Sequence, residues 1–137
     1  EPIAPTDVWQ KIGEEAGLQS LLRHFYADVR QDQALGPIFN ARIHDWPSHL
    51  EKIGAFWKRQ LGQPSRYPGG FAAAHLSLGI EELHFQRWLG LWERNCRQHL
   101  VPDAADWLIG RAHEIATQLR RVLCGIPTLQ VGSSPAR

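Results

Sequence analysis

The sequence predicts an all-α protein of one domain. Apolar residues recur at spacings of three and four along most of the chain, which is the pattern of amphipathic helices. No proline falls inside a predicted helix, and no stretch alternates polar and apolar residues as a half-buried strand does. The length of 137 residues suits one domain, and a content of 43% hydrophobic and 21% charged residues is typical of a globular protein.

The first third of the chain predicts one long helix between two short ones. A short helical segment over Val8–Ile12 comes first, and Gly13 and Gly17 mark its junction with the long helix. The long helix carries an apolar stripe: Leu18, Leu21, Leu22, Phe25, Tyr26 and Val29. After it, the segment Ala34–Asn40, interrupted by Gly36-Pro37, predicts one tight helical turn.

A second long helix is expected from Asp45 to about Leu61. Asp45 is a good N-cap residue, Pro47 suits the first turn, and Gly62 ends the helix. One face of this helix carries His49, Ile53, Phe56 and Gln60. The following stretch, 63–70, is rich in glycine and proline and predicts a loop, and 71–76 predicts one or two helical turns.

Two more long helices complete the predicted fold. One begins at Glu81 and Glu82 and ends near His99, and the other begins at Pro102. Their apolar faces are Phe85, Trp88, Leu89, Trp92 and Cys96 on the first, and Leu108, Ala112, Ile115, Leu119 and Val122 on the second. Glycine and proline at 125 and 127 end the domain, assigned to residues 1–127, and we expect the polar tail 128–137 to be disordered.

Composition excludes several classes of protein. A net charge of +1 gives no large positive field, so nucleic acid is not the expected partner. Two cysteines, Cys96 and Cys124, cannot form a disulfide framework or a cysteine-type zinc site. No apolar run reaches the roughly 18 residues of a membrane span, and the start of the sequence shows no signal peptide. We therefore expect a cytoplasmic monomer.

Two histidines stand out among the seven. His75 follows three alanines, and small residues beside it allow a bulky flat partner to approach closely. His49 lies on an apolar helix face with Ile53 and Phe56, so the two imidazoles can face opposite sides of one cofactor. The alternative is that each histidine is an ordinary structural residue and that the aromatic stripe is core packing.

Five segments together resemble a known family. They are His24–Val29, Leu35–Asn40, His49–Trp57, His75–Leu78 and His84–Leu89. In this order and spacing, over Val8 to Leu123, the sequence resembles the truncated haemoglobins, and most closely group III. The resemblance implies a two-over-two helical sandwich around haem b. Methionine is absent and there is no C-x-x-C-H motif, so a non-covalent haem with a histidine ligand is consistent with the composition.

The resemblance also implies a role for individual residues. His75 matches the proximal histidine that ligates the iron, and Phe39 matches the aromatic residue that wedges against the porphyrin. The distal ligand-binding positions are Tyr26, His49, Ile53 and Trp88. The remaining cofactor-binding positions are Lys52, Arg66 and Tyr67, expected to meet the haem propionates, together with Phe56 and Leu78.

The sequence is consistent with three functions. The first is the binding of dioxygen, CO and NO at an open iron site, with hydrogen bonds from Tyr26 and Trp88 to the ligand. The second is a redox enzyme, either a nitric oxide dioxygenase or a peroxidase-like protein, which needs an external reductase because the chain has no reductase domain. The third is a helical interaction domain without a cofactor.

Overall fold

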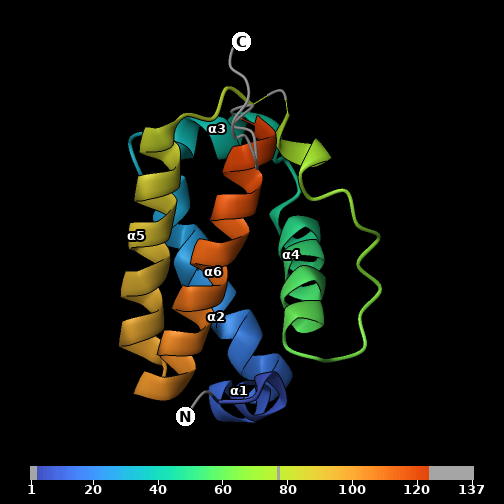
Figure 1. Ribbon diagram of the computed structural model, residues 1–137. Helices are drawn as coiled ribbons and strands as arrows, with labels where there is room; N and C mark the ends of the chain where they lie inside the picture. The colour runs from blue at the N-terminus through green and yellow to red at the C-terminus, as the bar shows by residue number, and fades with distance from the viewer. Residues whose placement is uncertain (1–2, 77, 124–137) are drawn as a thin grey trace, which may run out of the picture.

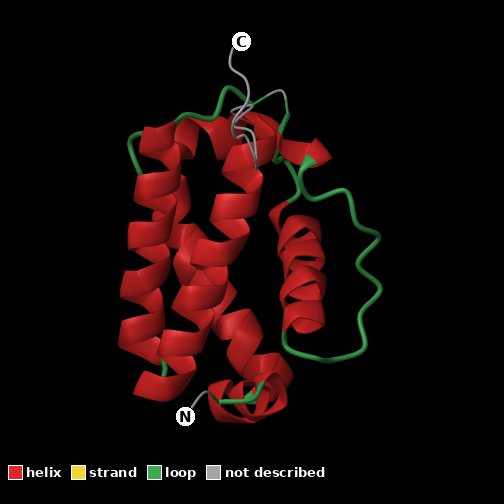
Figure 2. Ribbon diagram, in the orientation of Figure 1, coloured by secondary structure: helices red, strands yellow, loops and turns green. Residues whose placement is uncertain are grey.

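The computed structural model describes residues 3–76 and 78–123, and within them it is helical and contains no strand (Figure 2). The helices are α1 (Pro5–Ile12), α2 (Glu14–Gln31), α3 (Leu35–Arg42), α4 (Trp46–Gln60), the 3-10 turn η1 (Ala73–His75), α5 (Glu82–His99) and α6 (Pro102–Leu123). The predicted fold class and its long helices are therefore confirmed. The expected tail, 128–137, lies outside the described residues.

The long helices form two layers. Helices α5 and α6 run side by side in opposite directions, and α2 lies behind them (Figure 1). Helix α2 also packs against α4, so that α2 and α4 form one pair and α5 and α6 the other. Helix α3 and η1 lie at one end of this sandwich and α1 lies at the other (Figure 1). A loop without helix runs from the end of α4 along the outside of that helix to η1 (Figure 1).

Capping fixes where α4 and α5 begin. The Asp45 carboxylate accepts a hydrogen bond from the Ser48 N–H at 3.1 Å, and Pro47 occupies the first turn of α4, as predicted. At α5 the Glu81 carboxylate and the His84 ring form a reciprocal capping box, in which His84 Nδ1 accepts from the Glu81 N–H at 2.9 Å. These caps position the faces of both helices.

The junction between α1 and α2 requires glycine at two positions. Gly13 has a φ of +98°, a left-handed conformation that favours glycine. A Cβ atom at Gly17 would lie 1.7 Å from the carbonyl oxygen of Ile12, which is backbone and cannot move aside. The two glycines therefore allow α1 to fold back closely against the start of α2.

Helix α3 is longer than the single turn predicted for it. It continues to Arg42, and within it the Asn40 side chain donates a hydrogen bond to the carbonyl oxygen of Arg30 at 3.1 Å, which ties α3 to α2. Pro37 sits in its first turn, where its missing N–H costs nothing. Conversely, the segment 71–76 forms only the short 3-10 turn η1.

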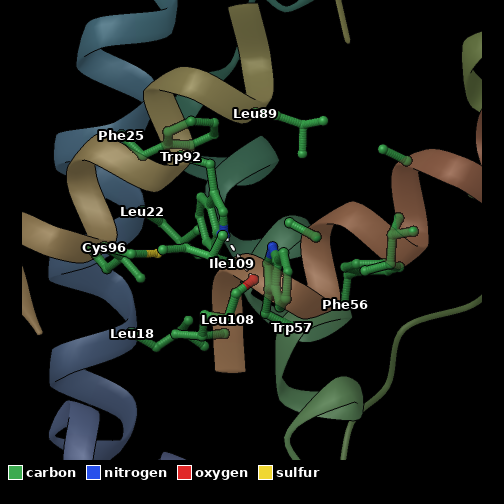
Figure 3. Packing of buried hydrophobic residues seen from close by; sticks show 14 of the residues in the cluster. Leu18, Leu22, Phe25, Phe56, Trp57, Leu89, Trp92, Cys96, Leu108 and Ile109 are labelled. Atoms are coloured by element: carbon green, nitrogen blue, oxygen red, sulfur yellow. Dashed lines mark hydrogen bonds between the residues drawn. The ribbon is translucent and has the colours of Figure 1, made fainter. Parts of the chain in front are cut away.

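The core fills the space between the two layers. Trp92 is fully buried, and its indole Nε1–H donates to the carbonyl oxygen of Leu108 at 3.0 Å, which joins α5 to α6 (Figure 3). Trp57 from α4 is 2% exposed and stacks on Trp92. Cys96 is a buried free thiol whose pKa burial raises to about 12, as expected of a small core residue.

The prediction that Val122 lies on the buried face of the last helix is wrong. Val122 is 53% exposed, whereas Leu119, one turn earlier, is buried. The stripe of buried residues on α6 thus ends at Leu119, close to where Arg120 pairs with Glu82 of α5. Along residues 3–76 and 78–123, no helix is both long enough and apolar enough to cross a membrane.

Candidate functional site

Aromatic rings from three helices surround one region at the α3 end of the sandwich. The Tyr26 ring of α2 lies 5.8 Å from the His49 ring of α4 and 6.0 Å from the Phe39 ring of α3, measured between centroids. Trp46, at the start of α4, contacts both the Tyr26 ring at 5.9 Å and the His49 ring at 5.4 Å. The Arg30 guanidinium covers the Trp46 ring at 4.5 Å. Trp46 therefore forms one wall of the candidate site.

Tyr26 and Trp88 are hydrogen-bonded to each other. The indole N–H of Trp88 can only donate, so the phenol oxygen of Tyr26 accepts. Burial raises the pKa of Tyr26, and the bond from Trp88 offsets only part of that effect, so the phenol keeps its proton. Because the phenol oxygen accepts from Trp88, the hydroxyl hydrogen of Tyr26 is left to donate elsewhere.

His49 has an unsatisfied atom inside the site. Its Nε2 is buried and has no hydrogen-bond partner. Leaving such an atom unpaired costs about 1–3 kcal/mol, so its presence in a folded protein points to a missing ligand. Burial, the Lys52 ammonium and the His75 ring together lower the pKa of His49.

His75, on η1, is held in one orientation. Its Nδ1 lies 2.6 Å from the carbonyl oxygen of Phe71. A carbonyl oxygen accepts and never donates, so Nδ1 carries the ring hydrogen and the neutral ring has its lone pair at Nε2. Burial lowers the pKa of His75, the bond to Phe71 raises it, and the Arg42 guanidinium lowers it further. The net effect favours the neutral imidazole, which is the form that ligates metals.

His49 and His75 belong to different elements but lie near each other. A charge on the His75 ring would lower the pKa of His49, after the larger effects of burial and of Lys52. Among residues 3–76 and 78–123, no three His, Cys, Asp or Glu side chains converge to hold a metal ion. His75 is therefore not part of a three-residue metal site within these residues.

The side of the site near His75 is built from stacked rings. Phe71 contacts the His75 ring at 4.7 Å and stacks on Phe56 at 4.8 Å with an interplanar angle of 16°. Ile53 and Leu78, both expected at the cofactor, are half-buried. The helical spacing of Ile53 and Phe56 on α4 places them on the face that carries His49.

The expected partners of the propionates are not gathered in one place. Lys52 and Arg66 are exposed, and Lys52 is close enough to His49 to act on its pKa. Tyr67 is buried against Phe56, with ring centroids 5.3 Å apart, and burial raises its pKa. The basic side chain at Tyr67 is Arg59, which donates to the Tyr67 carbonyl oxygen at 2.8 Å.

Sequence reasoning missed Trp46 and Phe71 as residues of this site. Trp46 lies three residues before His49, on the same face of α4, so helical spacing was a usable signal. Phe71 lies four residues before His75, but the segment is not a regular helix, so no periodicity indicates the contact.

The fold is that of a small globin. A family model described as bacterial-like globin matches residues 7–118. The group 3 truncated haemoglobin ctb of Campylobacter jejuni is 32% identical over 120 residues, which cover 84% of this chain and 94% of that protein. The chain therefore belongs to the bacterial-like globins, a family that binds haem.

Comparison with solved structures indicates which kind of globin the fold resembles. The crystal structure of a group III truncated haemoglobin from Campylobacter jejuni gives a TM-score of 0.73 at 31% identity and covers 85% of this chain and 92% of that one. The group II truncated haemoglobin of Bacillus anthracis gives a TM-score of 0.73 at 23% identity over 87% and 92% of the two chains, which supports the fold alone. The protein is a truncated haemoglobin of the two-over-two type, similar to group III.

Proposed function

We propose that this protein binds haem b through His75 and binds dioxygen, CO and NO on the distal side. When bound, haem supplies an iron with four porphyrin nitrogens and an affinity for diatomic gases. The observation that carries the proposal is the bond from His75 Nδ1 to the carbonyl oxygen of Phe71, which leaves the lone pair of Nε2 for a metal.

The protein side of the pocket fits this group. One neutral imidazole suffices as the protein ligand, which agrees with the lack of a metal-binding cluster in the described part of the chain. The unpaired Nε2 of His49 is a polar atom that a ligand on the distal side can satisfy. Phe39, Ile53, Phe56 and Leu78 offer apolar surface to a flat macrocycle, and Lys52, Arg66 and Arg59 offer positive charge to its propionates.

The two distal hydrogen-bond donors, Trp88 and Tyr26, form a chain that ends at the ligand. The Trp88 N–H donates to the Tyr26 oxygen, and the Tyr26 hydroxyl then donates to a diatomic ligand. Hydrogen bonds in such a chain polarise one another, and in a dry pocket they are stronger than in water. Tyr26 therefore contacts the ligand directly, and Trp88 orients and polarises Tyr26. His49 either donates to the ligand as well or moves aside to admit it.

Dioxygen release from the haem-loaded protein tests these roles. In stopped-flow measurements we expect Tyr26→Phe to accelerate release by about tenfold, since one hydrogen bond of about 1–1.5 kcal/mol is lost. Trp88→Phe should accelerate it less, because the Tyr26 hydroxyl remains. Trp107→Phe, on α6 and outside the site, is the matched control. Release unchanged in Tyr26→Phe would refute the proposed distal site.

A second candidate function uses the same pocket. The Tyr26 hydroxyl, which accepts from Trp88, gives the distal side a hydrogen-bond donor that also suits the conversion of NO and dioxygen to nitrate. That reaction consumes one electron per turnover, which an external reductase supplies. Nitrate formed in many turnovers with a reductant present would establish the enzyme, whereas a single stoichiometric reaction would leave only the binding function.

A further inference from the structure

Three tryptophan rings form a parallel stack that leads out of the site. Trp88 and Trp92, one turn apart on α5, have centroids 5.7 Å apart and an interplanar angle of 11°. Trp57 of α4 also stacks on Trp92, at 4.8 Å and 14°. Figure 3 shows the Trp57 and Trp92 rings facing each other inside the core.

The two ends of this stack differ in their surroundings. Trp88 is half-buried and donates to Tyr26, so that end belongs to the distal site. Trp92 and Trp57 are 0% and 2% exposed, so the other end is closed to water and to solutes. The stack therefore connects the distal site to the interior of the protein.

Filling the core does not by itself require indole at these positions, although the Trp92 N–H also bonds the carbonyl oxygen of Leu108. Phe25 already fills the space beside Trp88 and Trp92 with edge-on contacts at 5.2 and 4.9 Å, a common geometry for rings in a core. Indole differs from the other apolar side chains in its redox chemistry, because it loses one electron more easily than phenyl or aliphatic groups. Parallel faces at these separations give the overlap through which an electron passes from one ring to the next.

We propose that Trp88, Trp92 and Trp57 form a relay that removes one oxidising equivalent from the distal site and stores it in the core. The relay rests on the proposed haem function and acts when the haem-loaded protein meets a hydroperoxide. Reduction of hydrogen peroxide to two waters breaks its O–O bond and takes two protons from solvent and two electrons. Bound haem would supply one of these electrons, and Trp88 supplies the other. Trp92 then gives an electron to the oxidised Trp88, and Trp57 gives one to the oxidised Trp92.

No bond forms or breaks in the rings, and the Trp92 proton stays in place. Its Nε1–H donates to the carbonyl oxygen of Leu108, which cannot accept a proton at ordinary pH. The oxidised product is therefore a radical cation shared by the closely stacked Trp92 and Trp57. Sharing the charge reduces the cost of placing it in an apolar core. A neutral indole gives up an electron far more readily than it takes one, so the relay serves an oxidant in the pocket and not a reductase.

Freeze-quench electron paramagnetic resonance tests the relay. Ferric haem-loaded protein with deuterated tryptophan is mixed with one equivalent of hydrogen peroxide and compared with the unlabelled protein. We expect a tryptophanyl radical, recognised by line narrowing on deuteration. Its yield should fall severalfold in Trp92→Phe and Trp57→Phe, and it should persist in Trp107→Phe, a half-buried tryptophan of α6 outside the stack. An equal yield in Trp92→Phe and wild type would overturn the relay.

A measurement without haem tests the geometry on which the relay depends. Parallel indoles couple their excited states, so apoprotein should give an exciton couplet in the far-ultraviolet circular dichroism that Trp92→Phe abolishes and Trp107→Phe retains. A spectrum without that couplet would count against the stack. Failure of the wild type to take up haem would instead defeat the proposed function, and the relay with it. A normal haem spectrum with no tryptophanyl radical would defeat the relay alone.

Discussion

The imidazole Nδ1 of His75 lies 2.6 Å from the carbonyl oxygen of Phe71, four residues earlier in the chain. This one bond selects the tautomer of His75 and turns its Nε2 away from the backbone. The side chain of Phe71 supports the same ring from the side and stacks on Phe56 of α4. Phe71 thus holds the proposed iron ligand through both its backbone and its ring.

Removal of the Phe71 ring should weaken haem retention without removing the ligand. In Phe71→Ala the carbonyl oxygen still accepts from His75, but the contacts with His75 and Phe56 are lost. Since Phe71 is only half-buried, we expect a loss of about 1–2 kcal/mol, less than the roughly 3–5 kcal/mol of a fully buried phenylalanine, and haem dissociation about tenfold faster. Transfer of haem to a scavenger protein measures this rate. Unchanged dissociation would show that the ring does not support the ligand.

Two glycines of the chain should respond oppositely to alanine. A Cβ atom at Gly17 would overlap the Ile12 carbonyl, so Gly17→Ala should displace α1 and destabilise the protein by several kcal/mol. At Gly90, in α5, a Cβ atom meets nothing within 4 Å, so Gly90→Ala should stabilise by about 0.5–1 kcal/mol. Urea unfolding followed by far-ultraviolet circular dichroism measures both. Equal effects of the two substitutions would contradict the close approach at Gly17.

The Asp32 carboxylate should make stability depend on acid pH. Arg87 binds both of its oxygens, at 2.7 and 2.9 Å, and together with the N–H groups of Leu35 and Ala34 it lowers the Asp32 pKa from 3.8 to about 2. Because the pKa of Asp32 is lower in the folded protein than the unfolded value of 3.8, the ionised carboxylate stabilises the fold at pH values above 3.8. This stabilisation is lost as the pH falls towards 2.

The matched variant for this carboxylate is Asp32→Asn, which keeps an oxygen that accepts from the backbone. Its free energy of unfolding should lie about 1 kcal/mol below wild type at neutral pH, a modest value because Arg87 is partly in solvent. The difference should shrink as pH falls from about 4 to about 2. Urea unfolding over this range measures it. A difference independent of pH would mean that the charge of Asp32 contributes nothing.

The sequence was most informative where apolar spacing and caps agreed. Asp45 with Pro47, and the stripe from Leu18 to Val29, predicted α4 and α2 because the residues that decide those helices are local. The extension of α3 to Arg42 was not predicted, and neither was the contact of Asn40 with Arg30 of α2. The apolar periodicity of one segment does not predict its contacts with a distant segment.

The same limit applies to the candidate site. The resemblance to a family selected Tyr26, His49, Trp88 and His75, and the structure brings Tyr26 together with Trp88 and with His49. It did not indicate that the Trp88 N–H is already engaged by Tyr26, which makes Tyr26 the free donor. Nor did it indicate the stacking of Trp57 on Trp92, which joins α4 to α5.

The absorption spectrum of the ferrous protein with and without CO tests the central claim most directly. Wild type should bind one haem and show the Soret band of a histidine-ligated iron that shifts when CO binds. His75→Ala should lose that spectrum, and imidazole added to His75→Gly should restore it. His49→Ala, on the distal side, should keep the histidine-ligated spectrum. A Soret band that survives unchanged in His75→Ala would contradict the account.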